Sequence, residues 1–318
     1  MVSTINRAEH RILILLIRKS GEALLTAWTA VTLTFFALRA TTSDPTVNLL
    51  AQGLASPEQV ARLNASLFLD QPLLTQYGHF LLGLLNGDLG ISFYTHRSVT
   101  LTLAEQLRPT LELGALSVLF LLVFAALLGI TAAWQHNKPA GRAASWLADM
   151  LTTLPVALVG LLFLYLFASI RQHYGTGSSV FYTLALPAFV LGLSMSGAVA
   201  RILKSSLLDV LQEPYILAAR ARGLRKNGRL LWFALRPALP PAVSLSALEI
   251  AYLFSGTVVT ENIFSRPGLG RLLVSSILQG DFPVAQGVIT LAALFYTLTH
   301  FFAQTLSLLI DPRLRGIQ

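Results

Sequence analysis

TLELGALSVLFLLVFAALLGITAA, residues 110–133, is an almost uninterrupted apolar stretch in which Glu112 is the one charged residue. A helix needs about 20 mainly apolar residues to cross roughly 30 Å of hydrocarbon. Lipid offers no partners for backbone N–H and C=O groups, so a spanning segment this continuous must be helical. The stretch therefore predicts a transmembrane helix.

Five further segments have the same character, at about 15–38, 146–170, 182–203, 238–260 and 284–310. The whole chain of 318 residues is 54% hydrophobic and 12% charged, with a mean hydropathy of +0.65, whereas a soluble domain carries roughly 25% charged residues. We expect an all-α integral membrane protein with about six transmembrane helices. The first is interpreted as a retained helix, because no small-residue cleavage site follows it before about Ala40.

The distribution of basic residues predicts the orientation of these helices. Sixteen of the 23 lysines and arginines lie in the N-terminal segment, the loops 134–145 and 201–237, and the C-terminal tail. Cytoplasmic loops carry the excess of Lys and Arg, so we expect both termini in the cytoplasm. The net charge of +8 is thereby explained by topology and not by nucleic acid.

The segment 40–109 is then extracytoplasmic and, with the first helix, forms an N-terminal region 1–109. SPEQVARLNASL, residues 56–67, begins with a helix-start signal of serine, proline and glutamate. Residues 75–93 predict an amphipathic helix that ends at Asn86-Gly87. Such a helix either lies on the membrane surface or contacts a substrate receptor, and the two are compatible.

EPYILAARARGL, residues 213–224, interrupts the apolar pattern on the cytoplasmic side. Glu213 and Pro214 suit a helix start, because proline at the first helical position loses no hydrogen bond and a carboxylate favours the N-terminal dipole. Gly223 suits the left-handed position that ends a helix. The arginines alone would fit a plain connector under the charge rule. A proline start, an alanine stripe and a glycine stop together also fit a short helix that docks into another protein.

Residues 213–244, EPYILAARARGLRKNGRLLWFALRPALPPAVS, resemble the cytoplasmic EAA loop of ABC importer permeases of the dipeptide, oligopeptide and nickel branch. Ala218, Ala219 and Gly223 match its alanine and glycine positions, and Pro241 matches its terminal proline, whereas Leu217 stands where the eponymous glutamate would be. Residues 67–93, RPTLELG at 108–114, residues 260–287 and DPRLR at 311–315 are similar to further motifs of the same family in the same order.

The resemblance implies a type I ABC importer permease fold, with a core domain 110–318 that contains a cytoplasmic coupling loop at 205–237. It implies that the loop docks into one of two partner ATPase subunits, which bind ATP and Mg²⁺, so this chain needs no cofactor. A second homologous permease would complete the pore in a bacterial inner membrane, and an extracytoplasmic binding protein would deliver the substrate. The candidate coupling residues are Tyr215, Ala218, Ala219, Arg220, Arg222, Gly223 and Leu224.

The cargo is either a small peptide or nickel or a metal chelate. Charged groups within spanning segments usually face protein or a water-filled path. Glu249, with Tyr252 and Ser255 near the same face of the fifth helix, therefore either bonds to a neighbouring helix or lines the substrate path.

Other classes of protein lack their signatures in this sequence. There is no GxxxxGK[ST] phosphate loop, no HExxH, no GxSxG and no cysteine. The histidines lack ligand spacing, so no metal site is predicted. An intramembrane enzyme, or an assembly or receptor protein without ATPase coupling, is the alternative to a transporter permease.

Overall fold

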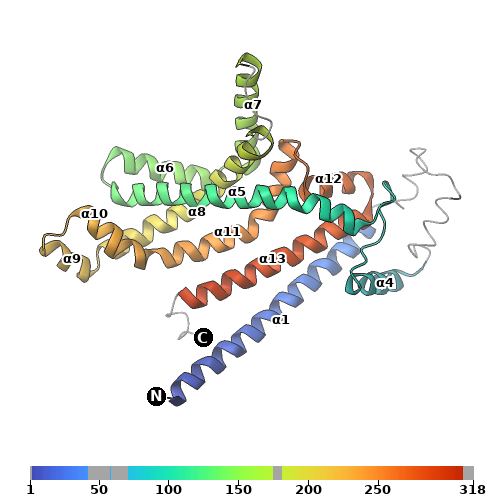
Figure 1. Cartoon of the computed structure of the whole chain (residues 1–318), viewed down its shortest axis with the longest axis horizontal. Coiled ribbons are helices and arrows are strands. Elements are labelled where there is room, and N and C mark those ends of the chain that lie inside the picture. Colours follow the sequence, from blue (N-terminus) through green and yellow to red (C-terminus); the bar gives the residue numbers. More distant parts are fainter. Residues whose placement is uncertain (1, 42–57, 59–70, 175–180, 311–318) are drawn as a thin grey trace. The chain divides into compact units, whose positions relative to one another are not determined.

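The computed structural model describes residues 2–41, 58, 71–174 and 181–310, and the chain divides into two compact units. The first comprises 1–111 and 265–297, and the second 112–264 and 298–318. Five of the described helices are long and apolar enough to span a membrane, or six if one bent pair is a single span. This confirms an all-α fold with about six spans (Figure 1).

The first unit contains α1 (Val2–Thr41), α4 (Leu73–Leu85), the beginning of α5 (Val99–Trp134), α12 (Leu269–Gln279) and the beginning of α13 (Phe282–Ile310). Aromatic and polar contacts hold α4 to the end of α1. Phe35 is fully buried and packs on Tyr77 and Phe80, with ring centroids 5.2 and 5.5 Å away. Arg39 lies over the Phe35 ring and its Nε donates a 2.9 Å hydrogen bond to Gln76 Oε1.

The structure confirms the predicted end of α4. Its last residue is Leu85, Asn86 caps it, and Gly87 has a φ of +75°, the left-handed conformation that glycine adopts without strain. The predicted helix at 56–67 lies outside the described residues, apart from Glu58.

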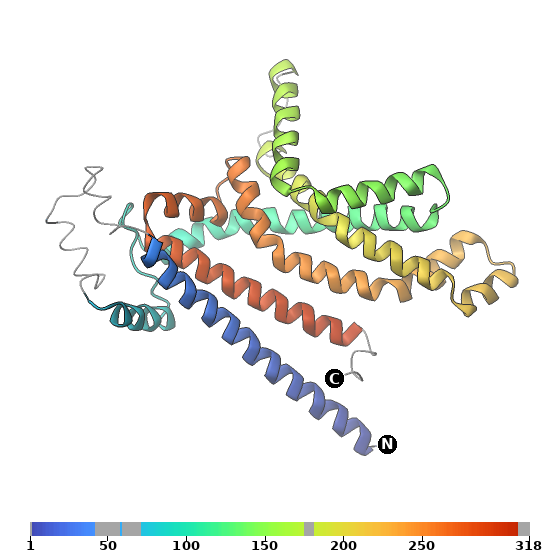
Figure 2. The ribbon, with the colours of Figure 1, turned by 180° about the vertical axis from the view of Figure 1, so that it is seen from behind.

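The second unit is built around α8 (Leu186–Leu211), which follows the short π-helix η1 (Phe181–Ala185). In Figure 1 and, from behind, in Figure 2, α8 runs between α6 (Pro139–Thr153) and α11 (Leu235–Ile263). Small residues allow these helices to approach closely, as in other membrane helix pairs. A Cβ at Gly197 would meet Thr152 Oγ1 at 2.8 Å, and one at Gly256 would meet Leu191 Cδ1 at 2.6 Å.

The third predicted span, at about 146–170, is not one straight helix. The chain there forms α6 and α7 (Val156–Tyr174) and bends by 109° at the break between them. Pro155 lies at the break, and Leu154 before it is extended, with φ −79° and ψ 128°. Proline disfavours the helical conformation of its predecessor and donates no hydrogen bond, so the apolar run continues while the helix does not (Figure 1).

The second span also differs from its predicted bounds, because α5 begins at Val99 and continues through Pro109. Its 36 residues extend to about 54 Å at 1.5 Å per residue, whereas the hydrocarbon core is roughly 30 Å thick. Part of α5 must therefore lie beyond the hydrocarbon.

Candidate coupling site

The start of α9 (Pro214–Ala221) has the predicted form. Glu213 is its extended N-cap, with ψ 143°, and Pro214 is the first helical residue. The Glu213 carbonyl accepts hydrogen bonds from the backbone N–H groups of Ile216 at 3.0 Å and Leu217 at 3.2 Å. These contacts fix the direction in which the chain enters the helix.

The end of α9 is fixed as well. Gly223 has a φ of +80°, and its N–H donates to the Arg220 carbonyl at 3.0 Å. The Leu224 N–H donates to the Ala219 carbonyl at 3.2 Å. These two bonds form a Schellman motif, which satisfies carbonyls that a helix end would otherwise leave unpaired. Since nothing lies within 4 Å of a Cβ built at Gly223, the glycine is required for its backbone conformation and not for space.

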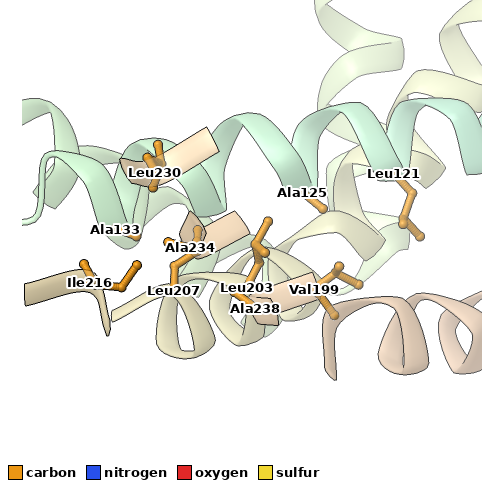
Figure 3. Packing of buried hydrophobic residues seen from close by; sticks show 11 residues of the cluster. Leu121, Ala125, Ala133, Val199, Leu203, Leu207, Ile216, Leu230, Ala234 and Ala238 are labelled. Carbon is orange, nitrogen blue, oxygen red and sulfur yellow. The ribbon is translucent and has the colours of Figure 1, made fainter. Parts of the chain in front are cut away.

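One face of α9 is held by the chain's own core. Ile216 and Ala219, three residues apart, are 2% and 4% exposed. Ile216 belongs to a buried cluster with residues of α5, α8 and α11, among them Ala133, Leu207 and Ala238 (Figure 3). Burying such a side chain contributes about 1.5–3 kcal/mol, which offsets the marginal stability of so short a helix.

The other face of α9 is open. Tyr215, Leu217 and Leu224 are 45%, 53% and 39% exposed, and Ala218, Arg220 and Arg222 are exposed beside them. The structure thus brings six of the seven predicted coupling residues together at the surface, while Ala219 supports the helix from within. Leu217, which departs from the family pattern, adds exposed apolar surface to this face.

The exposed face combines apolar surface with positive charge. Partial burial of the Tyr215 side chain and, secondarily, the nearby Glu213 carboxylate raise the pKa of the Tyr215 hydroxyl above its usual range. A tyrosine hydroxyl is neutral at physiological pH and can donate a hydrogen bond to a partner. Tyrosine and arginine are the residue types that most often carry binding energy in protein interfaces.

After the turn at residues 222–225, one continuous helical segment connects α9 to a membrane helix. It consists of α10 (Lys226–Gly228) and the π-helix η2 (Arg229–Ala234), which runs directly into α11. Leu230, Ala234 and Ala238 are all at most 5% exposed and belong to the same cluster as Ile216. A displacement of α9 would therefore be transmitted to α11 through a packed core.

The candidate path residues lie farther along α11. Glu249, Tyr252 and Ser255 follow one another at intervals of three residues, which places them along one side of a helix. Tyr252 and Ser255 are exposed, and Glu249 is half-buried. Among the described residues, no group of three or more His, Cys, Asp or Glu could hold a metal ion.

Two family motifs that lie far apart in the sequence contact each other in the first unit, and no local signal predicts this contact. Arg266 is 6% exposed, and its Nη2 donates a 3.1 Å hydrogen bond to the Pro109 carbonyl. The Leu269 N–H donates to Thr110 Oγ1 at 2.8 Å. The motif that contains Arg266 is thereby fastened to α5 at its proline.

Comparisons with known proteins agree with this architecture. The profile described as "Binding-protein-dependent transport system inner membrane component" matches residues 125–316, and that for the N-terminal part of such membrane components matches residues 12–114. The glutathione transport system permease protein GsiC of Salmonella choleraesuis is 33% identical over 273 residues, which are 86% of this chain and 89% of that protein.

A second relative is the probable peptide ABC transporter permease protein y4tP of Sinorhizobium fredii. It is 31% identical over 290 residues, which are 88% of this chain and 92% of the relative.

Among solved structures, the chain is similar to one of the inward-facing MetNI methionine ABC transporter, with a TM-score of 0.54 and 18% identity over 66% of this chain and 96% of that one. A second solved structure, of an amino acid ABC transporter with histidines, has a TM-score of 0.51 and 18% identity. The match covers 67% of this chain and 94% of that one. At this identity the likeness concerns the fold alone. The profile matches and the relatives above 30% identity show that the chain belongs to the binding-protein-dependent inner membrane component family, as a non-enzymatic permease subunit of the peptide/oligopeptide ABC importers.

Proposed function

We propose that this chain forms half of the pore of an importer for small peptides in a bacterial inner membrane, and that α9 couples it to an ATPase. One observation carries the coupling proposal. Both ends of α9 are fixed by backbone hydrogen bonds, Ile216 anchors one face, and the opposite face is open. A short helix held this way is a rigid projection that suits a cleft on a partner.

The partners follow from the proposal. Two ATPase subunits would bind and hydrolyse ATP, a second homologous permease would complete the pore, and an extracytoplasmic binding protein would deliver the cargo. Closure of the ATPase pair would push α9, and the packed core would convey that push to α11 as a rigid-body motion. The basic loops and both termini would face the cytoplasm.

Peptides are the favoured cargo class. GsiC is named for glutathione and y4tP for peptides, and these names favour peptides over the nickel alternative. Tyr252 and Ser255 are uncovered within this chain, as expected for residues that line a path between two permease subunits. Glu249 would attract the ammonium group of a peptide.

The test of coupling uses Ala218→Arg, with Ala143→Arg on α6 as the matched control. Both alanines are exposed, so neither change affects the core, whereas an arginine at Ala219 would also unseat α9. The complex is reconstituted in vesicles with its ATPases and binding protein, and glutathione uptake and ATP hydrolysis are measured. We expect Ala218→Arg to abolish uptake and ATPase co-purification while Ala143→Arg retains both. Normal uptake with Ala218→Arg would overturn the coupling proposal.

A further inference from the structure

A run of cations without any acid begins in α9 and continues beyond it. Between Pro214 and Leu248 the chain has six basic residues and no aspartate or glutamate. Three of the arginines flank Trp232, since Arg229 precedes it by three residues, Arg236 follows it by four, and Arg225 lies seven before it. Arg229, Trp232 and Arg236 lie toward one side of the helical segment that begins at Lys226, and Arg225 directly precedes that segment.

That side faces away from the core. Leu230 and Ala234, at alternate positions to Trp232, are 5% and 0% exposed, whereas Trp232 is 82% exposed. Arg225 and Arg236 are exposed too. No described residue forms an ion pair with any of the three arginines, because the two ion pairs of the described residues involve other side chains. The face thus presents positive charge that the described part of the chain leaves unneutralised.

Arg229 shows a second feature of this face. It is half-buried, and its Nε is covered by protein without a hydrogen-bond acceptor in the described structure. A partly dehydrated guanidinium without an acceptor is unfavourable. It binds an anion more strongly than a fully hydrated one, and its planar fork matches the oxygens of a phosphate.

The position of the face along the membrane helix indicates which anion is involved. Trp232 lies near the beginning of the apolar helical segment that reaches Ile263, and tryptophan gathers at the level of the lipid headgroups. Arg236 lies one turn farther along the same segment, where a long arginine side chain can extend to the interface. Phe233, 40% exposed, adds apolar surface beside the indole.

We propose that Arg225, Arg229, Trp232 and Arg236 form a binding site for an anionic phospholipid. The guanidinium groups bind its phosphates, and the indole packs against the upper part of its acyl chains. The site lies at the base of the segment that joins α9 to α11. A bound lipid therefore fixes the depth at which this segment lies in the membrane. The proposal depends on the membrane span at 232–263 and is independent of the cargo and of ATPase docking.

The test uses the purified complete importer in nanodiscs of phosphatidylcholine with or without phosphatidylglycerol. Native mass spectrometry counts the phospholipids retained after transfer to detergent. Each arginine near an anionic surface contributes about 1 kcal/mol, a factor of about five. We therefore expect Arg229→Gln with Arg236→Gln to lower phosphatidylglycerol retention about 25-fold, and Trp232→Ala to lower retention of both lipids. Lys138→Gln, which removes an exposed cation before α6, is the matched control and should retain the wild-type level.

Three results would overturn the proposal. Equal retention of phosphatidylglycerol by the wild type and the double variant would show that the face does not bind lipid. Loss of the second permease from the double variant, with lipid unchanged, would identify the face as a contact between permeases. Loss of the ATPase with lipid unchanged would assign the arginines to coupling. Failure of coupling itself is measured separately with Ala218→Arg, so the two proposals fail independently.

Discussion

The carboxylate of Asp281 accepts a hydrogen bond of 2.5 Å from the hydroxyl of Ser92, 189 residues earlier in the chain. The Phe93 N–H donates to the other carboxylate oxygen at 3.2 Å. Asp281 is 3% exposed and directly precedes α13, so its charge also interacts favourably with the positive end of that helix. Phe93 packs edge-on against Phe282 beside it, with ring centroids 6.2 Å apart. These contacts fasten the loop before α5 to the start of the last span.

Removing the Asp281 side chain should destabilise the protein more than removing the Ser92 hydroxyl. Ser92→Ala deletes one donor, at a cost of about 1 kcal/mol. Asp281→Ala leaves both the Ser92 hydroxyl and the Phe93 N–H buried without an acceptor, at about 1–3 kcal/mol for each. We expect the melting temperature in detergent to fall more for Asp281→Ala than for Ser92→Ala. Equal melting temperatures would show that the buried donors find other acceptors.

The same carboxyl predicts a pH dependence of stability. Burial raises the pKa of Asp281 above its usual range, and the hydrogen bonds from Ser92 and the backbone oppose this only in part. Because the native state then holds the proton more tightly than the unfolded chain, protonation stabilises the fold. This contribution is complete below the unfolded pKa, about 3.9, and is lost as the pH rises through the native pKa.

Asp281→Asn cannot titrate and serves as the reference for this effect. The difference in melting temperature between wild type and Asp281→Asn should shift in favour of the wild type as the pH is lowered from neutral towards about 4. Thermal unfolding of both proteins in the same buffers measures this difference in melting temperature. The contributions of the other carboxyls are the same in both proteins and cancel in the difference. A difference that stays constant, or shifts towards the variant at low pH, would contradict the raised pKa.

Local signals in the sequence predicted the features whose causes are local. Glu213 and Pro214 start α9 and Gly223 ends it, as expected, because caps act through neighbouring backbone groups. Pro155 shows the limit of hydropathy, since an apolar run of spanning length does not require a straight helix. The proline itself was a signal for the break.

Contacts between distant segments could not be predicted in this way. Nothing near Ser92 indicates Asp281 as its partner, and nothing near Pro109 indicates Arg266. The inward orientation of Ala219 can be predicted from the sequence, because Ile216 and Ala219 lie three residues apart and share a helical face. The alanine stripe was interpreted as a surface for a partner, whereas one of its members supports α9 against the core.

The backbone of Gly223 provides a matched pair of variants for the α9 cap. Gly223 has a φ of +80°, whereas Gly228 is helical with a φ of −65°, and neither has a neighbour within 4 Å of an added Cβ. Alanine in the left-handed region costs roughly 1–2 kcal/mol, while alanine in a helix is favourable. We expect Gly223→Ala to reduce uptake per ATP hydrolysed and Gly228→Ala to leave it unchanged. Gly223→Pro, which cannot adopt this φ, should abolish coupling with membrane insertion intact. Wild-type uptake per ATP hydrolysed in both Gly223 variants would show that coupling does not require the left-handed cap of α9.

Glu249 distinguishes a path residue from a structural one. Glu249→Gln keeps the size and the hydrogen-bonding capacity of the side chain but removes its charge. If the carboxylate attracts a peptide ammonium, uptake of a peptide with a free N-terminus should fall about tenfold or more, since hydrogen bonds to charged groups contribute about 1.5–3 kcal/mol. Uptake of the N-acetylated peptide should then be equal in wild type and variant, and the yield of assembled complex should be unchanged. Only a contact with the cargo can depend on the charge of the peptide's N-terminus. If the variant loses uptake of both peptides equally, or if its complex no longer assembles, the Glu249 carboxyl serves helix packing instead.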